Sequence, residues 1–327
     1  MRSPALRTAA LRNLSLRTAA LRTTVGVAEP ATDPERYVGA GTGVEEGGDG
    51  GAERGLLEAP GEDGGQDGCQ GNGVDELYGP AGLAVPSITG PAVLLRHGRS
   101  ESNESGRCGG WQDAPLTPEG EHQAREAALN LARSGLMPDS IHTSMLTRAI
   151  TTAQVVADEL GVDEDRIVRT WRLNERNAGA LEGLTRQEMI DGFGRKEMKR
   201  WRRNFDVRPP ALDPEDPRHP LNDRRYRGIP ADVLPDGESI LDATRRLLPY
   251  WHGPVAADLE AGKCVLVVGH AHLFRGLRGH LEQMSDEALR AIPVENGSAQ
   301  AYWFAGRCRV LLRRELACPS QQVLVGG

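Results

Sequence analysis

Two histidines in this chain each follow a short, strongly apolar run, and this pairing constrains the fold more than any other feature. Residues 92–95 (Ala-Val-Leu-Leu) lead into Arg96-His97-Gly98, and residues 264–268 (Cys-Val-Leu-Val-Val) lead into Gly269-His270. Short runs rich in β-branched residues are typical of parallel strands that are buried on both faces. Because open α/β sheets bind ligands outside the carboxyl ends of their strands, the two imidazoles are predicted to share one pocket.

The tripeptide Arg96-His97-Gly98 suggests chemistry on an anion. An imidazole can attack phosphorus, an arginine can clamp phosphoryl oxygens, and a glycine lets the backbone come close. A tripeptide alone is weak evidence, and the alternative for each histidine is a structural, hydrogen-bonded role. The choice between a catalytic and a structural role therefore depends on residues further along the chain.

Composition argues against several classes of protein. The formal net charge of −7 gives no reason to expect nucleic-acid binding. No run approaches the roughly 18 apolar residues that span a membrane. The five cysteines are scattered without a Cys-x-x-Cys pair, which favours reduced thiols and a cytoplasmic location over a disulfide framework or a zinc site.

The first 90 residues differ from the rest in composition. Residues 1–24 carry arginines at a five-residue spacing and no acidic residue, which indicates a low-complexity tail or, alternatively, an organelle transit peptide. Residues 25–90 are rich in glycine and acidic residues and cannot bury enough apolar surface to offset chain entropy. We expect residues 1–90 to be a disordered tail, residues 91–319 to form one catalytic domain, and residues 320–327 to be flexible.

Helix and strand signals alternate within residues 91–319. Thr117-Pro118 begins a helix that Gly135 ends, and Ser140–His142 is a predicted short strand. Thr143 and Ser144 are expected to cap a helix that runs through Leu160 and carries Arg148 near its start, where an anion would be favoured. The remaining signals are a polar, lid-like insertion at about 186–237, a helix over 238–252, and a hairpin formed by 301–304 and 309–312.

This alternation predicts a three-layer α/β/α fold with a mainly parallel sheet. About 230 residues are enough to bury a substantial core in a single domain.

A longer pattern joins these signals, and it resembles one known family. Its blocks occur in this order: Arg96-His97-Gly98, Asn103, Arg107, Gly110-Trp111, Leu116–Gly120, Thr143–Ala149, Leu173–Arg176, Gly179–Leu184, Trp201-Arg202-Arg203 and Gly269-His270. Over residues 91 to about 305 the chain resembles the histidine phosphatase superfamily, and most closely its branch of 2,3-bisphosphoglycerate-dependent phosphoglycerate mutases. The first 90 residues lie outside the resemblance.

The resemblance implies a role for each matching residue. His97 would be the nucleophile that becomes phosphohistidine, and Glu175 would be the general acid and base for the substrate hydroxyl. Arg96, Arg148 and His270 would stabilise charge on the transferring phosphoryl group. The residue types agree with this chemistry, because phosphoryl transfer depends mainly on positioning and charge neutralisation.

The resemblance also implies the ligands. The substrate would be a small phosphorylated molecule, 2,3-bisphosphoglycerate would prime the enzyme as phosphate donor, and no metal or permanently bound cofactor would be needed. A homo-oligomer is possible, whereas nucleic acid and membrane are not expected partners. The implied substrate-binding residues are Asn103, Gly109, Gly110, Arg176, Asn177, Ala178, Arg186, Arg202, Arg203, Ala271 and His272.

Several of these positions depart from the mutase pattern. Ala271-His272 stands where Gly-Asn is usual, and Asn177-Ala178 stands where His-Tyr is usual, so a tyrosine that would contact substrate is absent. Arg186 replaces a lysine, which keeps the charge but changes its geometry. Further departures are Arg99, Ser102 and Gly109.

Three functions remain in view from the sequence. The first is a phosphoglycerate mutase of glycolysis and gluconeogenesis, an isomerase that interconverts 3-phosphoglycerate and 2-phosphoglycerate. The second is a phosphatase of the same superfamily, favoured by the missing tyrosine and by His-Ala-His at residues 270–272. The third is an inactive binding or regulatory module, against which the intact Arg96, His97, Arg148, Glu175 and His270 argue.

Overall fold

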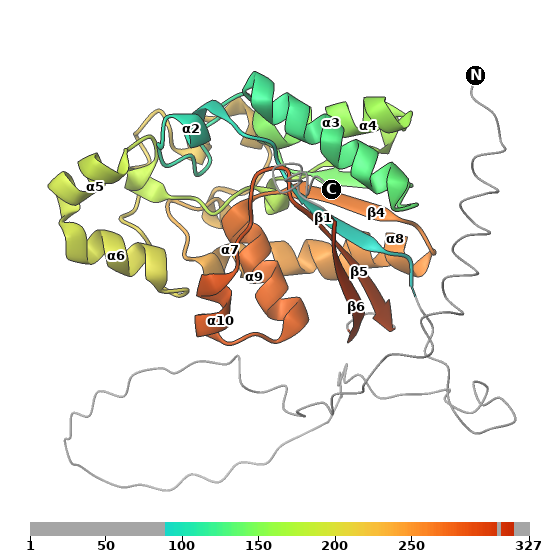
Figure 1. Cartoon of the computed structure of the whole chain (residues 1–327). Coiled ribbons are helices and arrows are strands. Elements are labelled where there is room, and N and C mark those ends of the chain that lie inside the picture. Colours follow the sequence, from blue (N-terminus) through green and yellow to red (C-terminus); the bar gives the residue numbers. More distant parts are fainter. Residues whose placement is uncertain (1–88, 306–308, 317–327) are drawn as a thin grey trace, which may run out of the picture. The chain divides into compact units, whose positions relative to one another are not determined.

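The computed structural model describes residues 89–305 and 309–316, which lie in one unit that begins at Pro86 (Figure 1). The expectations for the tail, including its alternative as a transit peptide, and for residues 320–327 fall outside these residues.

A six-stranded sheet forms the centre of the fold, in the order β3-β2-β4-β1-β5-β6. The strands are β1 (Ala92–Arg96), β2 (Ser140–Thr143), β3 (Ile167–Arg169), β4 (Val265–Gly269), β5 (Ala299–Ala305) and β6 (Arg309–Leu316). The first four pair in parallel, whereas β5 pairs antiparallel with both β1 and β6. The predicted mixed α/β fold, the short strand at 140–142 and the closing hairpin are therefore confirmed.

Both faces of the sheet are buried, and this explains the continuous apolar runs. Helices α3 (Pro118–Arg133) and α4 (Thr147–Leu160) pack together on one face, and α7 (Ile240–Tyr250) and α9 (Ala271–Glu282) pack together on the other (Figure 1). Successive strand side chains point to opposite faces: Val93 and Leu95 join the α3–α4 core, while Leu94 joins the α7–α9 core. A run with both faces covered has no polar alternation.

Helix α3 begins as predicted, but α4 does not. Thr117 accepts a hydrogen bond from the backbone N–H of Gly120, and Gly135 follows the helix with φ +73°. Helix α4 instead has Leu146 at its N-cap position, with no side-chain cap of its own. Its first N–H, from Thr147, donates to Asp113 over 2.8 Å, so the predicted caps Thr143 and Ser144 are wrong. The side chain of Ser144 is directed to His270 instead.

The polar insertion folds into helices α5 (Arg186–Phe193) and α6 (Arg195–Arg203), which pack together, followed by turns with little regular structure. These turns contain the short 3-10 segments η6 (Pro220–Asn222), η7 (Arg224–Tyr226) and η8 (Ala231–Val233). Tyr226 is buried, and its ring lies 4.8 Å from that of Trp111. The insertion is therefore packed against the loop that follows α2 (Glu101–Glu104).

The remaining elements connect the sheet and its helices. They are η3 (Glu164–Arg166), η4 (Trp171–Leu173), η5 (Gly179–Leu181), the π-helical turn η9 (Trp251–Val255), α8 (Ala256–Glu260) and α10 (Asp286–Ala291). Within the ranges described, none of the helices combines the length and the apolar character that a membrane span requires.

Candidate active site

The two histidines of the opening pattern meet at the carboxyl edge of the sheet. Strands β1 and β4 are parallel neighbours, with Arg96 opposite Gly269, and the N–H of His97 donates to the carbonyl of Gly269 over 3.0 Å. The ring centroids of His97 and His270 lie 5.0 Å apart. The predicted pairing of the imidazoles follows from this register.

The contacts of His97 fix which of its ring nitrogens can act. Its Nδ1 atom lies 2.6 Å from the carbonyl oxygen of Gly98, and a carbonyl can only accept, so Nδ1 carries the hydrogen. Burial, together with the nearby His270, Arg148 and Arg96, holds the pKa of His97 well below its usual range. At neutral pH His97 is therefore a neutral imidazole with its lone pair on Nε2, which is the form required of a nucleophile.

Gly98 is required by packing. A Cβ atom at this position would lie 2.0 Å from the carbonyl oxygen of Gly120 in α3, an approach that no side chain tolerates. The Gly98 N–H donates to Thr152 of α4 over 3.1 Å. The glycine thus lets the segment after β1 lie against the two helices, a packing reason for Gly98 where the sequence suggested close approach to an anion.

One ring nitrogen of His270 has a hydrogen-bond partner, and the other has none among the described residues. Its Nε2 lies 2.9 Å from the hydroxyl of Ser144, at the end of β2. Its Nδ1 is buried without a hydrogen-bond partner among the described residues. Buried polar atoms are rarely left unpaired, so this atom is suited to a ligand oxygen.

Two arginines bring positive charge to the histidine pair. Arg148, 3% exposed, donates to the carbonyls of Gln112 and Gly110 over 3.0 and 2.8 Å. Arg96 donates to the carbonyl of Val294 over 2.5 Å, while its buried Nε has no hydrogen-bond partner within residues 89–305 and 309–316. Burial lowers the pKa of Arg96 to about 10, which leaves it charged at neutral pH. The two guanidinium groups place positive charge beside the histidines, which favours an anion there.

The loop before Trp111 lies beside Arg148 and is tied to His97. Gly109 lies beside Arg148, since a Cβ atom on it would be 4.0 Å from the Arg148 Nη2 atom. The Asn103 side chain is exposed, and its oxygen accepts from the Asn296 amide over 3.0 Å. Asn296 also donates to the carbonyl of His97 over 3.1 Å, so it ties this loop to the histidine.

Glu175 caps helix α9 from a remote part of the chain. Its Oε2 accepts the backbone N–H of His272 and its Oε1 that of Leu273, each over 3.2 Å, and Oε1 also accepts from the Arg176 N–H over 2.7 Å. Burial alone would raise its pKa, but His272, His270 and the Arg176 N–H hold the pKa of Glu175 well below its usual range. Glu175 is therefore ionised at neutral pH.

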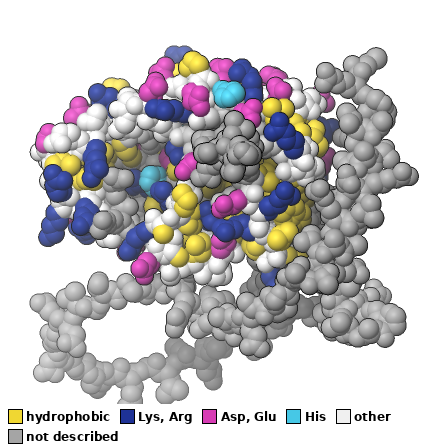
Figure 2. All heavy atoms as spheres, in the orientation of Figure 1, with side chains coloured by type: hydrophobic (Ala, Val, Ile, Leu, Met, Phe, Trp, Pro, Cys, Tyr) yellow, Lys and Arg dark blue, Asp and Glu magenta, His cyan; other side chains and the backbone are white. Residues whose placement is uncertain are grey.

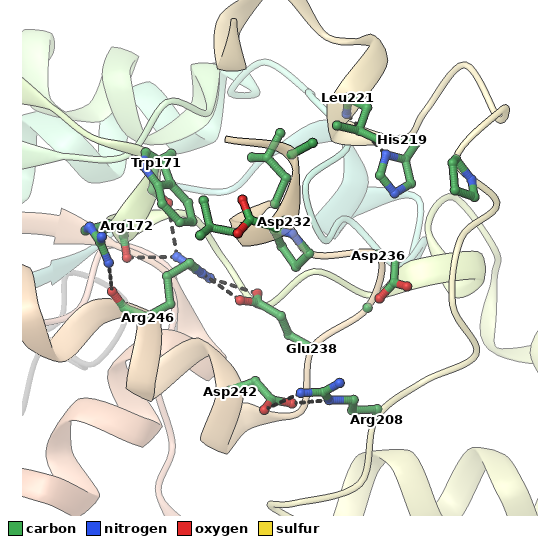
Figure 3. Close-up of a pocket in the computed structure, with 16 residues that line it drawn as sticks. Trp171, Arg172, Arg208, His219, Leu221, Asp232, Asp236, Glu238, Asp242 and Arg246 are labelled. Atoms are coloured by element: carbon green, nitrogen blue, oxygen red, sulfur yellow. Dashed lines mark hydrogen bonds and ion pairs between the residues drawn. The ribbon is translucent and has the colours of Figure 1, made fainter. Parts of the chain in front are cut away.

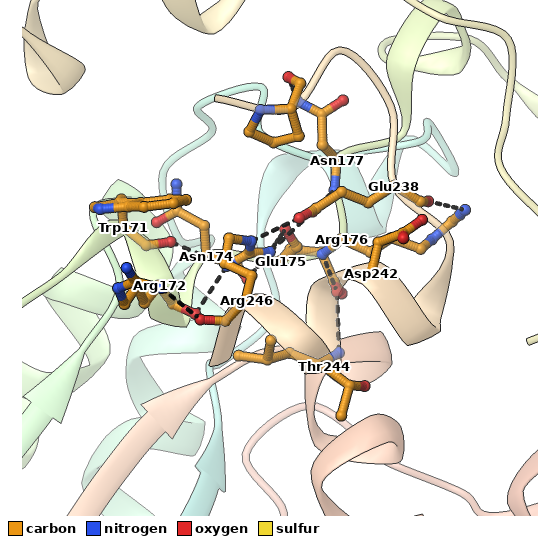
Figure 4. A network of polar contacts seen from close by, with 12 residues as sticks. Trp171, Arg172, Asn174, Glu175, Arg176, Asn177, Glu238, Asp242, Thr244 and Arg246 are labelled. Carbon is orange, nitrogen blue, oxygen red and sulfur yellow. Dashed lines mark hydrogen bonds and ion pairs between the residues drawn. The ribbon is translucent and has the colours of Figure 1, made fainter. Parts of the chain in front are cut away.

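Arg246 and Glu238 hold the Glu175 segment in place (Figure 4). The two side chains form a buried ion pair with N–O distances of 2.6 and 2.9 Å. Arg246 Nη2 also donates to the carbonyls of Asn174 and Glu175, each over 3.1 Å. Trp111 Nε1 donates to the same Glu175 carbonyl over 2.6 Å. The backbone of Glu175 is thereby fixed from two sides.

A cavity of about 550 Å³ lies next to this network (Figure 3). Trp171, Glu238 and Arg246 contribute to its wall, whereas His97 and Glu175 do not. Its charged side chains include two ion pairs, Arg246–Glu238 and Arg208–Asp242. The cavity therefore borders the Arg246–Glu238 network and is separate from the histidine pair.

The residues implied as substrate-binding occupy several different environments. Arg176 is 7% exposed, and its buried Nε has no hydrogen-bond partner in the part of the chain that the structure describes. Asn177 and Ala178 are fully buried: Asn177 bonds to Glu238 and Pro235, and Ala178 packs with Leu181 and Trp201.

The remaining implied residues lie on α5, α6 and α9. Arg186 is exposed at the start of α5, and Ala271 begins α9. His272 contacts Glu175. Arg202 and Arg203 end α6, and their side chains lie outside the described part of the structure.

Sequence reasoning missed the part that three residues play in the site: Ser144, which was expected only to cap a helix, Asn296 and Glu182. The Glu182 side chain is 2% exposed, and its Oε1 accepts from the N–H groups of Trp111 and Ala178 over 2.7 and 3.2 Å. Burial raises the pKa of Glu182 to about 7. The one signal in the sequence was that Glu182 is an acidic residue in an otherwise apolar block, residues 179–184. Only the fold shows that its side chain is buried.

The geometry defines a class of chemistry. A neutral histidine with a free Nε2, a second histidine with an open Nδ1, two arginines and a carboxylate suit transfer of a phosphoryl group to and from His97. The match to known families agrees: the model described as "Histidine phosphatase superfamily (branch 1)" covers residues 92–227 and 213–316. The chain belongs to the histidine phosphatase superfamily.

Within the superfamily, several similar curated proteins carry the same name. The chain is 43% identical over 228 residues to the 2,3-bisphosphoglycerate-dependent phosphoglycerate mutase of Nitratidesulfovibrio vulgaris (strain Miyazaki F), covering 70% of this chain and 92% of the relative. It is 40% identical over 227 residues to the protein of the same name from Actinobacillus succinogenes, covering 68% and 99%.

A solved structure supports the fold. The mycobacterial glucosyl-3-phosphoglycerate phosphatase in complex with VO3 superposes with a TM-score of 0.52 at 24% identity, covering 69% of this chain and 97% of that one. At this identity the likeness concerns the fold alone.

Proposed function

We propose that this protein is a 2,3-bisphosphoglycerate-dependent phosphoglycerate mutase that interconverts 3-phosphoglycerate and 2-phosphoglycerate. The observation that carries the proposal is the identity of about 40% to proteins of that name over almost their full length. The site residues are compatible with it, because a covalent phosphohistidine can return its phosphoryl group to a different hydroxyl.

In the proposed reaction, Nε2 of His97 accepts a phosphoryl group from 2,3-bisphosphoglycerate and passes it to the monophosphate. Arg96, Arg148 and Nδ1 of His270 stabilise the equatorial oxygens during each transfer. Glu175 acts as general base and acid: it accepts the proton of the substrate hydroxyl and returns it in the reverse direction. Arg176, with its unpaired Nε, and the basic helix α6 are candidates to bind the substrate carboxylate.

A phosphatase of the same superfamily is the second candidate. The observation that favours it is the pair His272 and Ala178 at positions where the mutase pattern has asparagine and tyrosine. With water in place of the second hydroxyl, the same phosphohistidine would yield inorganic phosphate.

One assay separates the two. The purified full-length chain is given 3-phosphoglycerate with and without 2,3-bisphosphoglycerate, while 2-phosphoglycerate and inorganic phosphate are both measured. Conversion stimulated by the bisphosphate with little free phosphate supports the mutase. Phosphate release without isomerisation supports the phosphatase, and His97→Ala must abolish either activity.

A further inference from the structure

A second pair of histidines, His252 and His280, meets in the layer of helices that contains α7 and α9. His252 belongs to the π-helical turn η9, which follows α7 directly, and His280 lies in the last turn of α9. Their Nε2 atoms are 3.2 Å apart, and the two ring planes are inclined by 74°. At about 1.5 Å per residue, His280 lies about 12 Å further along α9 than His272, so this pair is outside the candidate active site.

The backbone that carries each of the two histidines is fixed by packing. Trp251 precedes His252 and Leu281 follows His280; both are buried and belong to the same apolar core cluster. A proline lies on each side of His252 within the helical segment, at positions 249 and 254, and restricts the backbone there. The two imidazoles are therefore brought together by the folded chain, on a π-helical turn of a kind that is rare and frequent at functional sites.

The distance between the two nitrogens suits a shared metal ion. Two imidazole nitrogens on one tetrahedral Zn²⁺ ion, each about 2.0–2.1 Å from the metal, lie about 3.3 Å apart. Neighbouring nitrogens of a square-planar site, as preferred by Cu²⁺, lie about 2.9 Å apart. The observed 3.2 Å is closer to the tetrahedral value. A hydrogen bond between the two rings spans a similar distance, and the experiment below separates the two cases.

The surroundings favour a cation and leave room for water. The last turn of α9 presents the negative end of the helix dipole, which stabilises positive charge. His252 is exposed, and a Cβ atom on the adjacent Gly253 would meet no other atom within 4 Å. In the part of the chain that the structure describes, no group of three or more His, Cys, Asp or Glu side chains could hold a metal. The two imidazoles would therefore form an open site, with water as the remaining ligands.

We propose that His252 and His280 bind one Zn²⁺ ion through their Nε2 atoms, with water completing a tetrahedral coordination. Each ring then carries its hydrogen on Nδ1, because both Nε2 lone pairs are used by the metal. The ion holds the C-terminal end of α9 against the turn that follows α7. It binds a geometry that only the folded chain provides, so it stabilises the fold. This inference does not depend on the proposed function, since its test measures no turnover.

The test compares zinc binding by the full-length chain and by three variants: His252→Gln, His280→Gln and the double variant. Glutamine keeps a hydrogen-bonding side chain but has no imidazole nitrogen. Equilibrium dialysis against a series of Zn²⁺ concentrations is carried out with a phosphine reductant at pH 7.5, where a histidine with the usual pKa of about 6.5 is mainly neutral. We expect each single variant to lose one bound Zn²⁺ ion per chain and the double variant to lose no more, because the site needs both rings.

Thermal unfolding provides the second measurement. Zn²⁺ at about 100 times its dissociation constant is expected to raise the Tm of the unsubstituted chain by about 5 °C or more, and that of the three variants by less than about 1 °C. His122→Gln replaces an exposed histidine of α3 and should behave like the unsubstituted chain in both measurements.

Two results of the dialysis would overturn the proposal. Unchanged zinc binding in the double variant would show that the two rings are only hydrogen-bonded. Losses that add up from the two single variants would show two independent histidines. Circular dichroism without zinc checks that the variants fold, and His252→Ala and His280→Ala replace any that do not. Nitrogen NMR of the unsubstituted chain needs no variant: zinc must shift the Nε2 signals of His252 and His280, and unshifted signals also overturn the proposal.

Discussion

The hydroxyl of Ser144 lies 2.9 Å from Nε2 of His270, with both side chains buried. The same hydroxyl oxygen accepts the N–H of Leu146 over 3.2 Å, so its own hydrogen is free to point at the imidazole. His270 then carries its ring hydrogen on Nδ1, the unpaired atom at the site. With this hydroxyl as donor, a serine at the end of β2 fixes the tautomer of a histidine that follows the neighbouring strand β4.

Removal of this hydroxyl should therefore weaken phosphoryl transfer without unfolding the protein. Ser144→Ala is expected to lower the rate of His97 phosphorylation about fivefold, since one buried hydrogen bond contributes roughly 1 kcal/mol. The measurement is a rapid-quench time course, with Ser134→Ala at the end of α3 as a control. A rate equal to that of the unsubstituted chain would contradict the tautomer assignment.

His97 should remain neutral through the range in which free histidine titrates. Because the folded-state pKa lies well below the unfolded value of 6.5, the unfolded chain binds the additional proton as the pH falls. Stability from this group is thus present above pH 6.5 and is lost below it, by up to about 1.4 kcal/mol per pH unit.

Two measurements check this prediction. Nitrogen NMR of the imidazoles should show no titration of His97 near pH 6.5. Denaturant unfolding between pH 5 and 7 should give a smaller pH dependence in His97→Asn than in the unsubstituted chain. Equal pH dependence of the free energy of unfolding in both proteins would argue against a neutral buried His97.

Glu182 should make the protein less stable as the pH rises. Its folded pKa of about 7 exceeds the unfolded value of 4.5, so its stabilising contribution is complete at low pH and is lost between pH 4.5 and 7. Glu182→Gln keeps a carbonyl oxygen for the N–H groups of Trp111 and Ala178 and does not ionise. We expect the variant to be more stable at pH 8.5, by on the order of 3 kcal/mol, and about equal at pH 5. Urea titrations of both proteins at pH 5 and pH 8.5 measure their free energies of unfolding. If the variant differs from the unsubstituted chain by the same amount at both pH values, the prediction is wrong.

The buried pair Arg246–Glu238 should matter far more than the exposed pair Arg208–Asp242. Arg246→Met leaves the buried Glu238 carboxylate unpaired and removes the hydrogen bonds to Asn174 and Glu175. The expected loss is about 3–5 kcal/mol of unfolding free energy, with reduced turnover. Arg208→Met, where the arginine is 66% exposed, should cost less than about 1 kcal/mol. Urea denaturation of the two variants gives the comparison, and similar losses would refute it.

Local sequence patterns predicted much of the fold. The apolar runs at β1 and β4, the Thr117-Pro118 start of α3 and the closing hairpin are all present. Each of these signals depends on neighbours within a few residues, which is the range over which backbone propensity and capping act. The cap of α4 was predicted wrongly because its partner, Asp113, is 34 residues away and belongs to a loop without regular structure.

The candidate site also combines features that the sequence predicted with features that depend on the fold. The sequence alone determined which residues can carry the chemistry, because residue type fixes the available nucleophile, charge and proton donors, and it indicated that His97 and His270 each follow a buried parallel strand. Only the tertiary structure decided the state of each group. Glu175 is an ionised helix cap because N–H groups 97 and 98 residues away point at it, and Glu182 has a raised pKa because packing removes it from water. Protonation and orientation depend on burial and on remote partners, and these exist only once the chain has folded.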